Sequence, residues 1–234
     1  MKKLKIITWN VNSIRKRIDL LIELIKEEDP DFIFLQETKI EDNNFPEVDN
    51  YINYLSGEKG KNGVAILSKY ECEYVENLIY LGRLVSVKFN NLILCSLYMY
   101  NGFSNLSPKE KKIELYKWMT ESMKEIETPM IVGGDFNIVY KTNEVTMENP
   151  YEADEIHYYQ QWEKHFFDTT PNEKFITWWD YRQMSFHLNK GYGLDKFYLK
   201  NHDNFQKPQV LKHFRAKPQP SDHAPLKIII NFED

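Results

Sequence analysis

Cysteine is scarce in this chain of 234 residues, and long apolar runs are missing. Its two cysteines, Cys72 and Cys95, lie far apart, each in or near an ordinary strand, so neither a disulfide framework nor a thiolate metal site is indicated. The basic start, Met1 to Lys5, leads into an apolar run that stops at Trp9, too short for a signal peptide core. No stretch approaches membrane-spanning length. We therefore expect a cytoplasmic protein with no membrane partner.

A basic excess, which is usual in proteins that coat nucleic acid, is also missing, because the formal net charge is −5. Positive charge is nevertheless clustered. One group is Arg15, Lys16 and Arg17, and a second, which includes Lys212 and Arg215, precedes Ser221. A local patch can bind phosphate where the average charge does not. For any single residue, an ordinary solvated charge explains the observation equally well.

Signatures of several other chemistries are missing too. The chain has no His-Glu-x-x-His zinc helix, no Walker phosphate loop and no Gly-x-Ser-x-Gly nucleophile elbow. What it does have is 42% hydrophobic residues without a break in composition, which is enough to bury one substantial core. We therefore predict a single domain over residues 1–234.

The spacing of apolar residues predicts a β-α-β opening, with a strand over 4–8, a helix from 14 that Asp29-Pro30 ends, and a strand over 32–35. Ser107-Pro108-Lys109-Glu110 has the form of a capping box and predicts a helix to about residue 126, and another is expected over 153–166. Further strands are predicted at 63–67, 84–89, 92–98, 130–133, 194–199 and 226–232.

Two segments resemble each other, residues 6–10 and 131–137, because each is an apolar strand that ends in an asparagine. The pattern suggests two similar halves. We therefore predict the α/β class, with two mixed β-sheets packed face to face and flanked by helices, and with both strand ends on one rim.

Polar side chains stand where the predicted strands end. Glu37 follows a buried run, Asp135 follows a pair of glycines that would let another backbone or a substrate come close, and Asp222-His223 precedes the last strand. A single acid at a strand end is more often the first solvated residue of a loop. The whole ordered set is more informative than any member: Asn10, Glu37, Tyr98, Asp135, Asn137, Asp195 and His223.

These residues lie in segments that resemble exonuclease III and its abasic endonuclease relatives, from the first strand to the last. The segments are Trp9 to Arg15, Leu35-Gln36-Glu37-Thr38-Lys39, Gly134 to Ile138, Trp178 to Arg182, Gly193-Leu194-Asp195 and Ser221-Asp222-His223-Ala224-Pro225. Leu-Gln-Glu-Thr-Lys together with Ser-Asp-His-Ala-Pro is far more specific than Gly-Asp-x-Asn alone, which a wider superfamily of endonucleases, exonucleases and phosphatases shares. The resemblance implies a four-layered α/β sandwich.

It also implies magnesium-dependent hydrolysis of a phosphodiester, a reaction in which fixed positive charge must meet the negative charge that develops on phosphoryl oxygens. Glu37, with Asn10 and Asp222, would hold Mg²⁺, for which Mn²⁺ is an acceptable substitute. By the same resemblance Asp135 orients or deprotonates the attacking water and Asn137 bonds near it. Asp195 holds His223 towards the phosphate, and Tyr98 lends a hydroxyl group.

The expected DNA contacts also come from the resemblance. Trp178, Tyr192 and Leu194 match positions that line a pocket for a flipped-out baseless sugar. For each aromatic residue, core packing is an equally good explanation. Asn101, with Gly102, matches a loop that contacts phosphate, and Asn12 and Arg15 in the first matching segment are further candidates.

The chain departs from the family at three places. Gly193 stands where relatives often carry arginine, and Lys196 stands where an aromatic or aliphatic residue is common, which suggests that one cationic contact has moved. The region 138–167 is short and rich in acidic and aromatic residues, among them Glu148, Tyr151, Glu152, Asp154 and Glu155. Because this region normally reaches over DNA, we predict weak duplex binding that is unusually sensitive to salt.

The sequence thus predicts a monomeric repair nuclease that cuts double-stranded DNA 5′ to abasic sites and extends to trimming or unblocking 3′ ends. Two alternatives remain open: a phosphodiesterase of the same superfamily acting on RNA or a phospholipid head group, and a module that binds damaged DNA with weak catalysis. The balance between incision and exonuclease action, and the number of metal ions, do not follow from the sequence.

Overall fold

The computed structural model describes residues 2–58, 61–101 and 108–232. Their strands form two six-stranded sheets, here sheet A and sheet B. In sheet A the order is β11 (Phe205–Val210), β12 (Leu226–Phe232), β1 (Lys2–Asn10), β2 (Phe32–Gln36), β4 (Lys61–Ser68) and β3 (Ile52–Glu58). In sheet B it is β5 (Glu73–Tyr74), β6 (Leu84–Phe89), β7 (Leu92–Tyr98), β8 (Met130–Asp135), β10 (Asp195–Lys200) and β9 (Phe167–Asp168).

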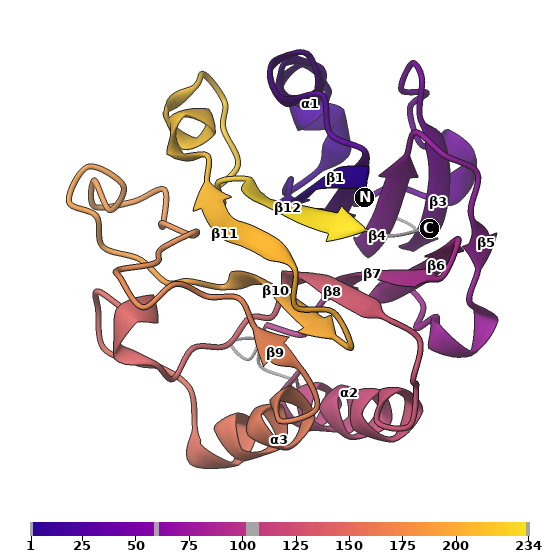
Figure 1. Ribbon diagram of the computed structural model, residues 1–234. Helices are drawn as coiled ribbons and strands as arrows, with labels where there is room; N and C mark the ends of the chain where they lie inside the picture. Colours follow the sequence, from indigo (N-terminus) through magenta and orange to yellow (C-terminus); the bar gives the residue numbers. More distant parts are fainter. Residues whose placement is uncertain (1, 59–60, 102–107, 233–234) are drawn as a thin grey trace.

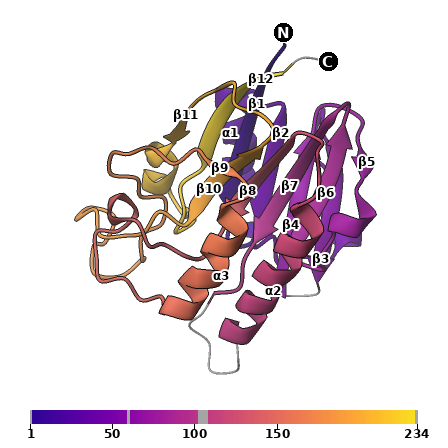
Figure 2. The same cartoon turned by 60° about the horizontal axis from the view of Figure 1, so that its bottom comes forward.

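Helices cover the outer faces of both sheets. Helix α1 (Ile14–Glu28) lies on sheet A, and helices α2 (Pro108–Met123) and α3 (Ala153–Glu163) lie side by side on sheet B (Figures 1 and 2). Within the described ranges, four 3-10 turns complete the regular structure: η1 (Asp42–Asn44), η2 (Glu76–Leu78), η3 (Thr142–Glu144) and η4 (Lys212–Ala216). The layers therefore follow the predicted order of helix, sheet, sheet and helices. Among the described residues, no helix has the length and apolar character needed to cross a membrane.

The apolar strands explain this layering. In β2, Phe32 and Phe34 point into the core between the sheets, whereas Ile33 and Leu35 point towards α1. Alternate side chains of a strand face opposite sides, so a strand that is apolar throughout needs cover on both faces. Trp162 of α3 packs with α2 residues over the other sheet. Apolar side chains are thus buried in three places: between the two sheets, between sheet A and α1, and between sheet B and helices α2 and α3. Their burial stabilises the sandwich.

The two sheets share one plan, as the similar segments predicted. In sheet A the parallel pair β1 and β2 lies between antiparallel strands, and in sheet B the parallel pair β7 and β8 does the same. Parallel neighbours end at the same edge of a sheet. Asp195 begins β10 directly opposite Asp135, which ends β8. The last residues of four strands and the first of a fifth therefore meet on one rim.

Most predicted elements are confirmed, with helix ends that differ by three residues. Helix α2 ends at Met123 rather than 126, and α3 ends at Glu163 rather than 166. The proposed capping serine at 107 lies outside the described residues. Four strands were not predicted, β3, β5, β9 and β11, and each is the edge strand of its sheet. Edge strands are short or polar, or contain a proline, as β11 does at Pro208. They therefore lack the apolar pattern on which the prediction depends.

Candidate active site

The rim is built around a close approach of β7 and β8. Gly134 has φ 153°, and a Cβ atom there would lie 2.0 Å from the carbonyl oxygen of Leu97. Only glycine fits this contact, because any side chain would overlap the neighbouring backbone. The close backbone predicted from the glycine pair is therefore that of β7. It sets Asp135 beside Tyr98 in the strand register.

His223 lies in the rim as a fully oriented imidazole. Its Nδ1 is 2.8 Å from Oδ2 of Asp195, and its Nε2 is 3.8 Å from Oδ2 of Asp135. The backbone amide of Asp195 donates to the Thr177 hydroxyl at 3.0 Å, and Asp195 has no exposed surface. An imidazole whose Nδ1 faces a buried carboxylate presents Nε2 on the other side. The structure thus brings the predicted pair together and aims it at Asp135.

Both carboxylate oxygens of Asp135 accept hydrogen bonds from amide groups. The backbone amide of Asn137 donates to Oδ1 at 2.9 Å, while the side chains of Asn10 and Asn137 donate to Oδ2 at 2.9 and 3.2 Å. Asn137 holds this geometry with φ 47° and with a second bond from its side chain to the carbonyl oxygen of Met99 at 2.9 Å. These bonds fix the carboxylate in one rotamer.

Glu37 connects sheet A to the same network. Its Oε1 accepts hydrogen bonds from Asn10 at 3.0 Å and from the Tyr98 hydroxyl at 2.9 Å. Its Oε2 lies 2.7 Å from the ammonium of Lys39, which also donates to the Asn12 side chain at 2.7 Å. Glu37 is in the left-handed region, with φ 50°, so the chain turns sharply as it leaves β2. Asn10 therefore bridges two carboxylates from different sheets.

Asp222 completes the cluster from the loop before β12. Its Oδ1 accepts from the Asn12 side chain at 3.0 Å and its Oδ2 accepts from the indole of Trp178 at 2.9 Å. The neighbouring Ser221 hydroxyl donates to the Asn10 carbonyl oxygen at 2.6 Å. The loop is thereby tied to the end of β1, and Asn12 joins Asp222 to the Lys39 ammonium.

The charges perturb one another because they are buried together. Burial raises the pKa of Asp135 to about 7, with the neighbouring Asp195 and Glu37 charges acting in the same direction and His223 against it. Burial acts to lower the pKa of His223, but Asp195 and Asp135 raise it to about 10. Despite burial, Lys39 and Asn10 hold the pKa of Glu37 below its ordinary value. A buried carboxyl group with a pKa near neutrality is suited to exchange a proton.

The donor set fits a magnesium ion better than a transition metal. Within the described ranges, no three histidine, cysteine, aspartate or glutamate side chains converge as metal ligands. Glu37 and Asp222 supply two carboxylates, which suits Mg²⁺, since this ion commonly takes one or two carboxylates and completes its shell with water and phosphate. The Asn10 amide oxygen, which accepts from the Asn12 backbone amide at 3.1 Å, is a third oxygen of the same cluster. The ammonium of Lys39 already lies against Glu37, so this part of the rim favours positive charge.

The residues predicted to contact DNA are only partly brought together. Trp178 and Tyr192 stack at the edge of the site, with ring centroids 5.6 Å apart and an interplanar angle of 10°. Leu194 is only 5% exposed and packs in the core under α2 and α3, so a role in a sugar pocket remains a prediction for that residue. Arg15 and Asn101 are exposed.

The structure explains Gly193 and corrects the expectation for Lys196. A Cβ atom at Gly193 would lie 2.5 Å from the Phe175 carbonyl oxygen, so an arginine does not fit there without a rearrangement. Lys196 is not a displaced DNA contact. It is fully buried, forms an ion pair with Glu144 at 2.9 Å and donates to the Tyr159 hydroxyl at 3.0 Å. Its position next to Asp195 on β10 places it on the opposite face, towards α3.

Two lysines partly neutralise the acidic stretch over 148–155. Glu155 is buried and paired with Lys112, and Lys109 forms ion pairs with both Glu152 and Asp154. Tyr151 is buried in the same layer. The expected acidic surface over DNA is therefore weaker than the sequence suggested. The predicted salt sensitivity loses part of its basis, although the net charge still supports it.

Three cations organise the rim in ways that the sequence does not predict. Lys39 lies in a matching segment that implies no role for it. Arg17, expected in the basic patch with Arg15 and Lys16, is instead buried and donates to the carbonyl oxygens of Asn12 and Pro220 at 2.8 and 2.9 Å. Arg83 is 7% exposed and lies 4.6 Å above the Tyr98 ring, and its Nε and Nη1 have no hydrogen-bond partner among the described residues. Their contacts join distant segments, so local sequence patterns do not reveal them.

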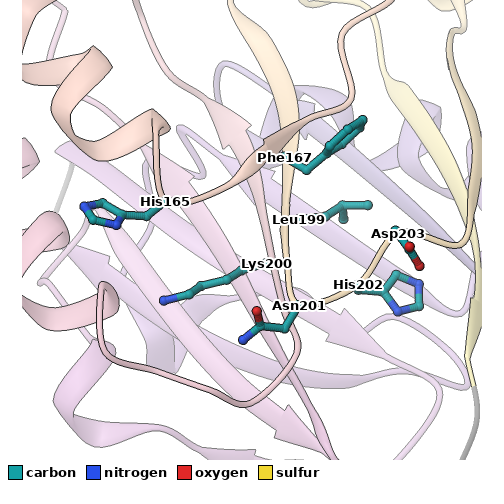
Figure 3. A pocket seen from close by; sticks show the side chains of 7 residues that line it. All are labelled: His165, Phe167, Leu199, Lys200, Asn201, His202 and Asp203. Atoms are coloured by element: carbon teal, nitrogen blue, oxygen red, sulfur yellow. The ribbon is translucent and has the colours of Figure 1, made fainter.

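A second hollow lies at the opposite end of β10, where Lys200, His165 and His202 are among the lining residues (Figure 3). The Lys200 ammonium donates to the carbonyl oxygens of Met123 and Lys124 at 2.7 and 2.6 Å. It therefore satisfies the end of α2, as cations commonly do at helix ends. This hollow is separate from the rim.

An α/β sandwich that gathers an aspartate-oriented histidine, a second buried aspartate and a cluster of carboxylate and amide oxygens on one rim defines a class of hydrolase. The chain belongs to the Endonuclease/Exonuclease/phosphatase family, whose model matches residues 7–223. This match and the relatives described next confirm the resemblance to exonuclease III and its relatives.

Individual relatives cover nearly the whole chain. An exodeoxyribonuclease of Bacillus subtilis is 28% identical over 97% of this chain and all of its own length. Exodeoxyribonuclease III of Haemophilus influenzae is 27% identical over 95% of this chain and 98% of its own length. Among solved structures, an AP endonuclease from Archaeoglobus fulgidus has a TM-score of 0.89 at 28% identity, covering 98% of this chain and 100% of that one. The four-layered fold is therefore that of these nucleases.

Proposed function

We propose that this protein is a magnesium-dependent DNA phosphodiesterase of base-excision repair that cuts the backbone 5′ to abasic sites. The observation that carries the proposal is the chain of polar contacts from Asp195 to Glu37. Hydrogen bonds join Asp195 to His223 and join Asp135 through Asn10 to Glu37, and a charge contact of 3.8 Å joins His223 to Asp135. The exodeoxyribonucleases and the AP endonuclease that the chain resembles support DNA as the substrate.

In the proposed reaction, a water molecule attacks the phosphorus atom, the bond to the 3′ oxygen breaks, and the departing 3′ oxygen takes up a proton from solvent to become a hydroxyl group. Asp135 orients this water and takes its proton, for which a pKa raised to about 7 is favourable. His223, charged and held by Asp195, stabilises the negative charge that develops on the phosphoryl oxygens. The Tyr98 hydroxyl and the Asn137 side chain act as hydrogen-bonding groups beside them. Each contributes part of the rate, since a positioned acid or base supplies roughly 10²–10⁴.

Glu37, Asp222 and Asn10 are the residues that would hold Mg²⁺, with Mn²⁺ as a substitute. When bound there, the ion acts as a Lewis acid and shields the charge of the substrate. The Lys39 ammonium contacts Glu37 and donates to the Asn12 side chain, which in turn donates to Asp222. Lys39 therefore lies between the two carboxylates. Its ammonium would lie beside a cation held by these residues.

Selection of the abasic site is assigned to the stacked pair Trp178 and Tyr192. Turning a nucleotide out of the duplex costs a few kcal/mol and least where the base is missing, so a small aromatic pocket favours abasic sites. Asn12, Arg15 and Asn101 are proposed phosphate contacts, and the buried Arg83 adds a cation beside Tyr98. We further propose that the enzyme unblocks and trims 3′ ends. It is proposed to act as a monomer in the cytoplasm, where its two free cysteines would remain reduced.

The proposal is tested with a duplex that contains one tetrahydrofuran abasic analogue, incubated with Mg²⁺ or with EDTA. A nick is expected only with Mg²⁺, and Asp135→Asn should abolish it while leaving duplex binding unchanged. A matched control, Asp203→Asn in the hollow at the far end, should cut at the normal rate. If Asp135→Asn cuts normally, Asp135 has no catalytic role. Faster hydrolysis of RNA or of a phospholipid head group than of the abasic duplex would refute DNA as the substrate.

A further inference from the structure

A lysine that no step of the proposed reaction uses lies directly beneath the catalytic turn. Lys112 of α2 is fully buried, and its ammonium donates to the Asn137 carbonyl oxygen at 2.7 Å and to Oε1 of Glu155 at 2.9 Å. It also lies 4.3 Å from the ring centroid of Tyr151. Burying a charge costs free energy, and even a paired and hydrogen-bonded charge often adds little net stability. Stability alone therefore does not explain why a lysine lies here.

The turn that Lys112 contacts carries two residues of the site. Asn137 has φ 47°, a conformation that costs free energy in residues other than glycine and persists where its surroundings impose it. In that conformation its backbone amide donates to Oδ1 of Asp135 at 2.9 Å. The orientation of the Asp135 carboxylate therefore depends on the geometry of this turn.

Helix α2 holds the peptide groups on both sides of Asn137. The Tyr116 hydroxyl donates to the Phe136 carbonyl oxygen at 3.1 Å, and Lys112 binds the Asn137 carbonyl oxygen. The two side chains are four residues apart and so lie on one face of the helix. Glu155 of α3, which is 4% exposed, keeps the ammonium in place from the other side. The two helices thus clamp the turn through one ion pair.

We propose that Lys112 is a positioning residue for phosphodiester hydrolysis: its buried ammonium holds the turn after β8 so that Asn137 fixes the Asp135 carboxylate. The inference rests on the proposed function. Lys112 touches neither substrate nor reacting atoms and acts through Asn137. Its loss should lower kcat, while the KM for the abasic duplex and the affinity for Mg²⁺ stay the same.

The test compares two variants that differ only at Lys112. Glu155→Gln keeps the ammonium on the Asn137 carbonyl oxygen and should retain kcat within about threefold. The double variant Lys112→Met/Glu155→Gln removes the ammonium without leaving an unpaired carboxylate, and its kcat should fall about 10–100-fold, the range expected when a reacting group is slightly misplaced. As a stability control, Met119→Ala opens a cavity beside the same helix. At temperatures below the midpoint of its thermal unfolding, this variant should keep the kcat of the wild type.

A second readout separates this inference from the proposed function. Amide hydrogen exchange of Asn137 should accelerate at least tenfold in the double variant and stay unchanged in Glu155→Gln and Met119→Ala. If the wild-type protein cuts no DNA, the proposed function fails, and the exchange rate still decides whether Lys112 holds the turn. The inference is overturned if the double variant keeps kcat within threefold, if its Asn137 exchange is unchanged, or if Met119→Ala loses as much kcat.

Discussion

Replacing Asp195 by asparagine should disable the enzyme while leaving its fold intact. Asparagine has nearly the same shape, and Asp195 has no exposed surface, so the change is one of charge and hydrogen bonding rather than packing. At present the Asp195 carboxylate accepts the Nδ1 hydrogen of His223 at 2.8 Å. The amide of asparagine can instead donate a hydrogen to Nδ1, and the imidazole proton would then lie on Nε2. If Nδ1 keeps its own hydrogen, the donating amide nitrogen is not a suitable partner for it.

The expected loss follows from the role proposed for His223 in stabilising the developing charge. Without Asp195 the imidazolium is less favoured, and the pKa of His223 should fall from its raised value of about 10, because Asp195 is the main group that raises it. A charged group positioned at the reacting phosphate is worth roughly 10²–10⁴ in rate, or about 2.7–5.4 kcal/mol at about 1.36 kcal/mol per factor of ten. We therefore expect kcat of Asp195→Asn to fall by about 10²–10⁴.

Single-turnover incision of the abasic duplex measures this loss without interference from product release. His223→Ala serves as the reference for complete removal of the imidazole, and thermal unfolding checks that the variant is folded. If Asp195→Asn cut within about threefold of the wild type while His223→Ala lost more than about 10²-fold, orientation of His223 by Asp195 would not matter to the reaction. The reasoning from the buried pair would then be wrong.

Three further predictions concern the frame of the site. Gly134→Ala should lower the free energy of unfolding by about 3 kcal/mol or more, measured with urea, because its Cβ would meet the Leu97 carbonyl oxygen; an unchanged midpoint would contradict the close contact. Burial acts to raise the pKa of Asp168, but Lys196 and other cations lower it overall, so its stabilisation is present above about pH 4 and is lost as the pH falls through the folded pKa. Asp168→Asn should therefore destabilise the protein by about 1–3 kcal/mol at pH 7 and less at pH 3, and an equal loss at both would refute the charge effect. Arg83→Met should lower kcat/KM by about 10-fold or more while unfolding stays within about 1 kcal/mol, since two of its nitrogens lack partners among the described residues, and unaltered kcat/KM would exclude a role near Tyr98.

The central elements could be predicted from the sequence because their patterns are local. The strand over 226–232 was predicted with its observed bounds, and the strands before Glu37 and Asp135 were found because strands buried on both faces are apolar throughout. The four edge strands were missed, since an edge faces solvent and carries polar residues or proline. Burial of both faces therefore governs which strands a sequence pattern reveals.

The residues of the site also divide into those that the sequence predicts and those that it does not. Residues at strand ends, such as Asn10, Asp135 and Asp195, could be placed on one rim because the two similar segments and the resemblance to exonuclease III imply it. Lys39 and Lys112 could not, because the contact of Lys39 with Asn12 and that of Lys112 with Asn137 each join residues at least 25 positions apart. Lys196 was misjudged for a related reason: a strand sends neighbouring side chains to opposite faces, and only the structure shows that Asp195 takes the rim and Lys196 the core.

The most direct test is to locate the cut on a labelled duplex with one tetrahydrofuran residue and on the same duplex without it. With Mg²⁺, a single incision immediately 5′ to the lesion that leaves a 3′ hydroxyl is predicted, together with far slower attack on the intact strand. Cutting both duplexes at the same internal positions, or cutting the lesion duplex equally well in EDTA, would contradict the account.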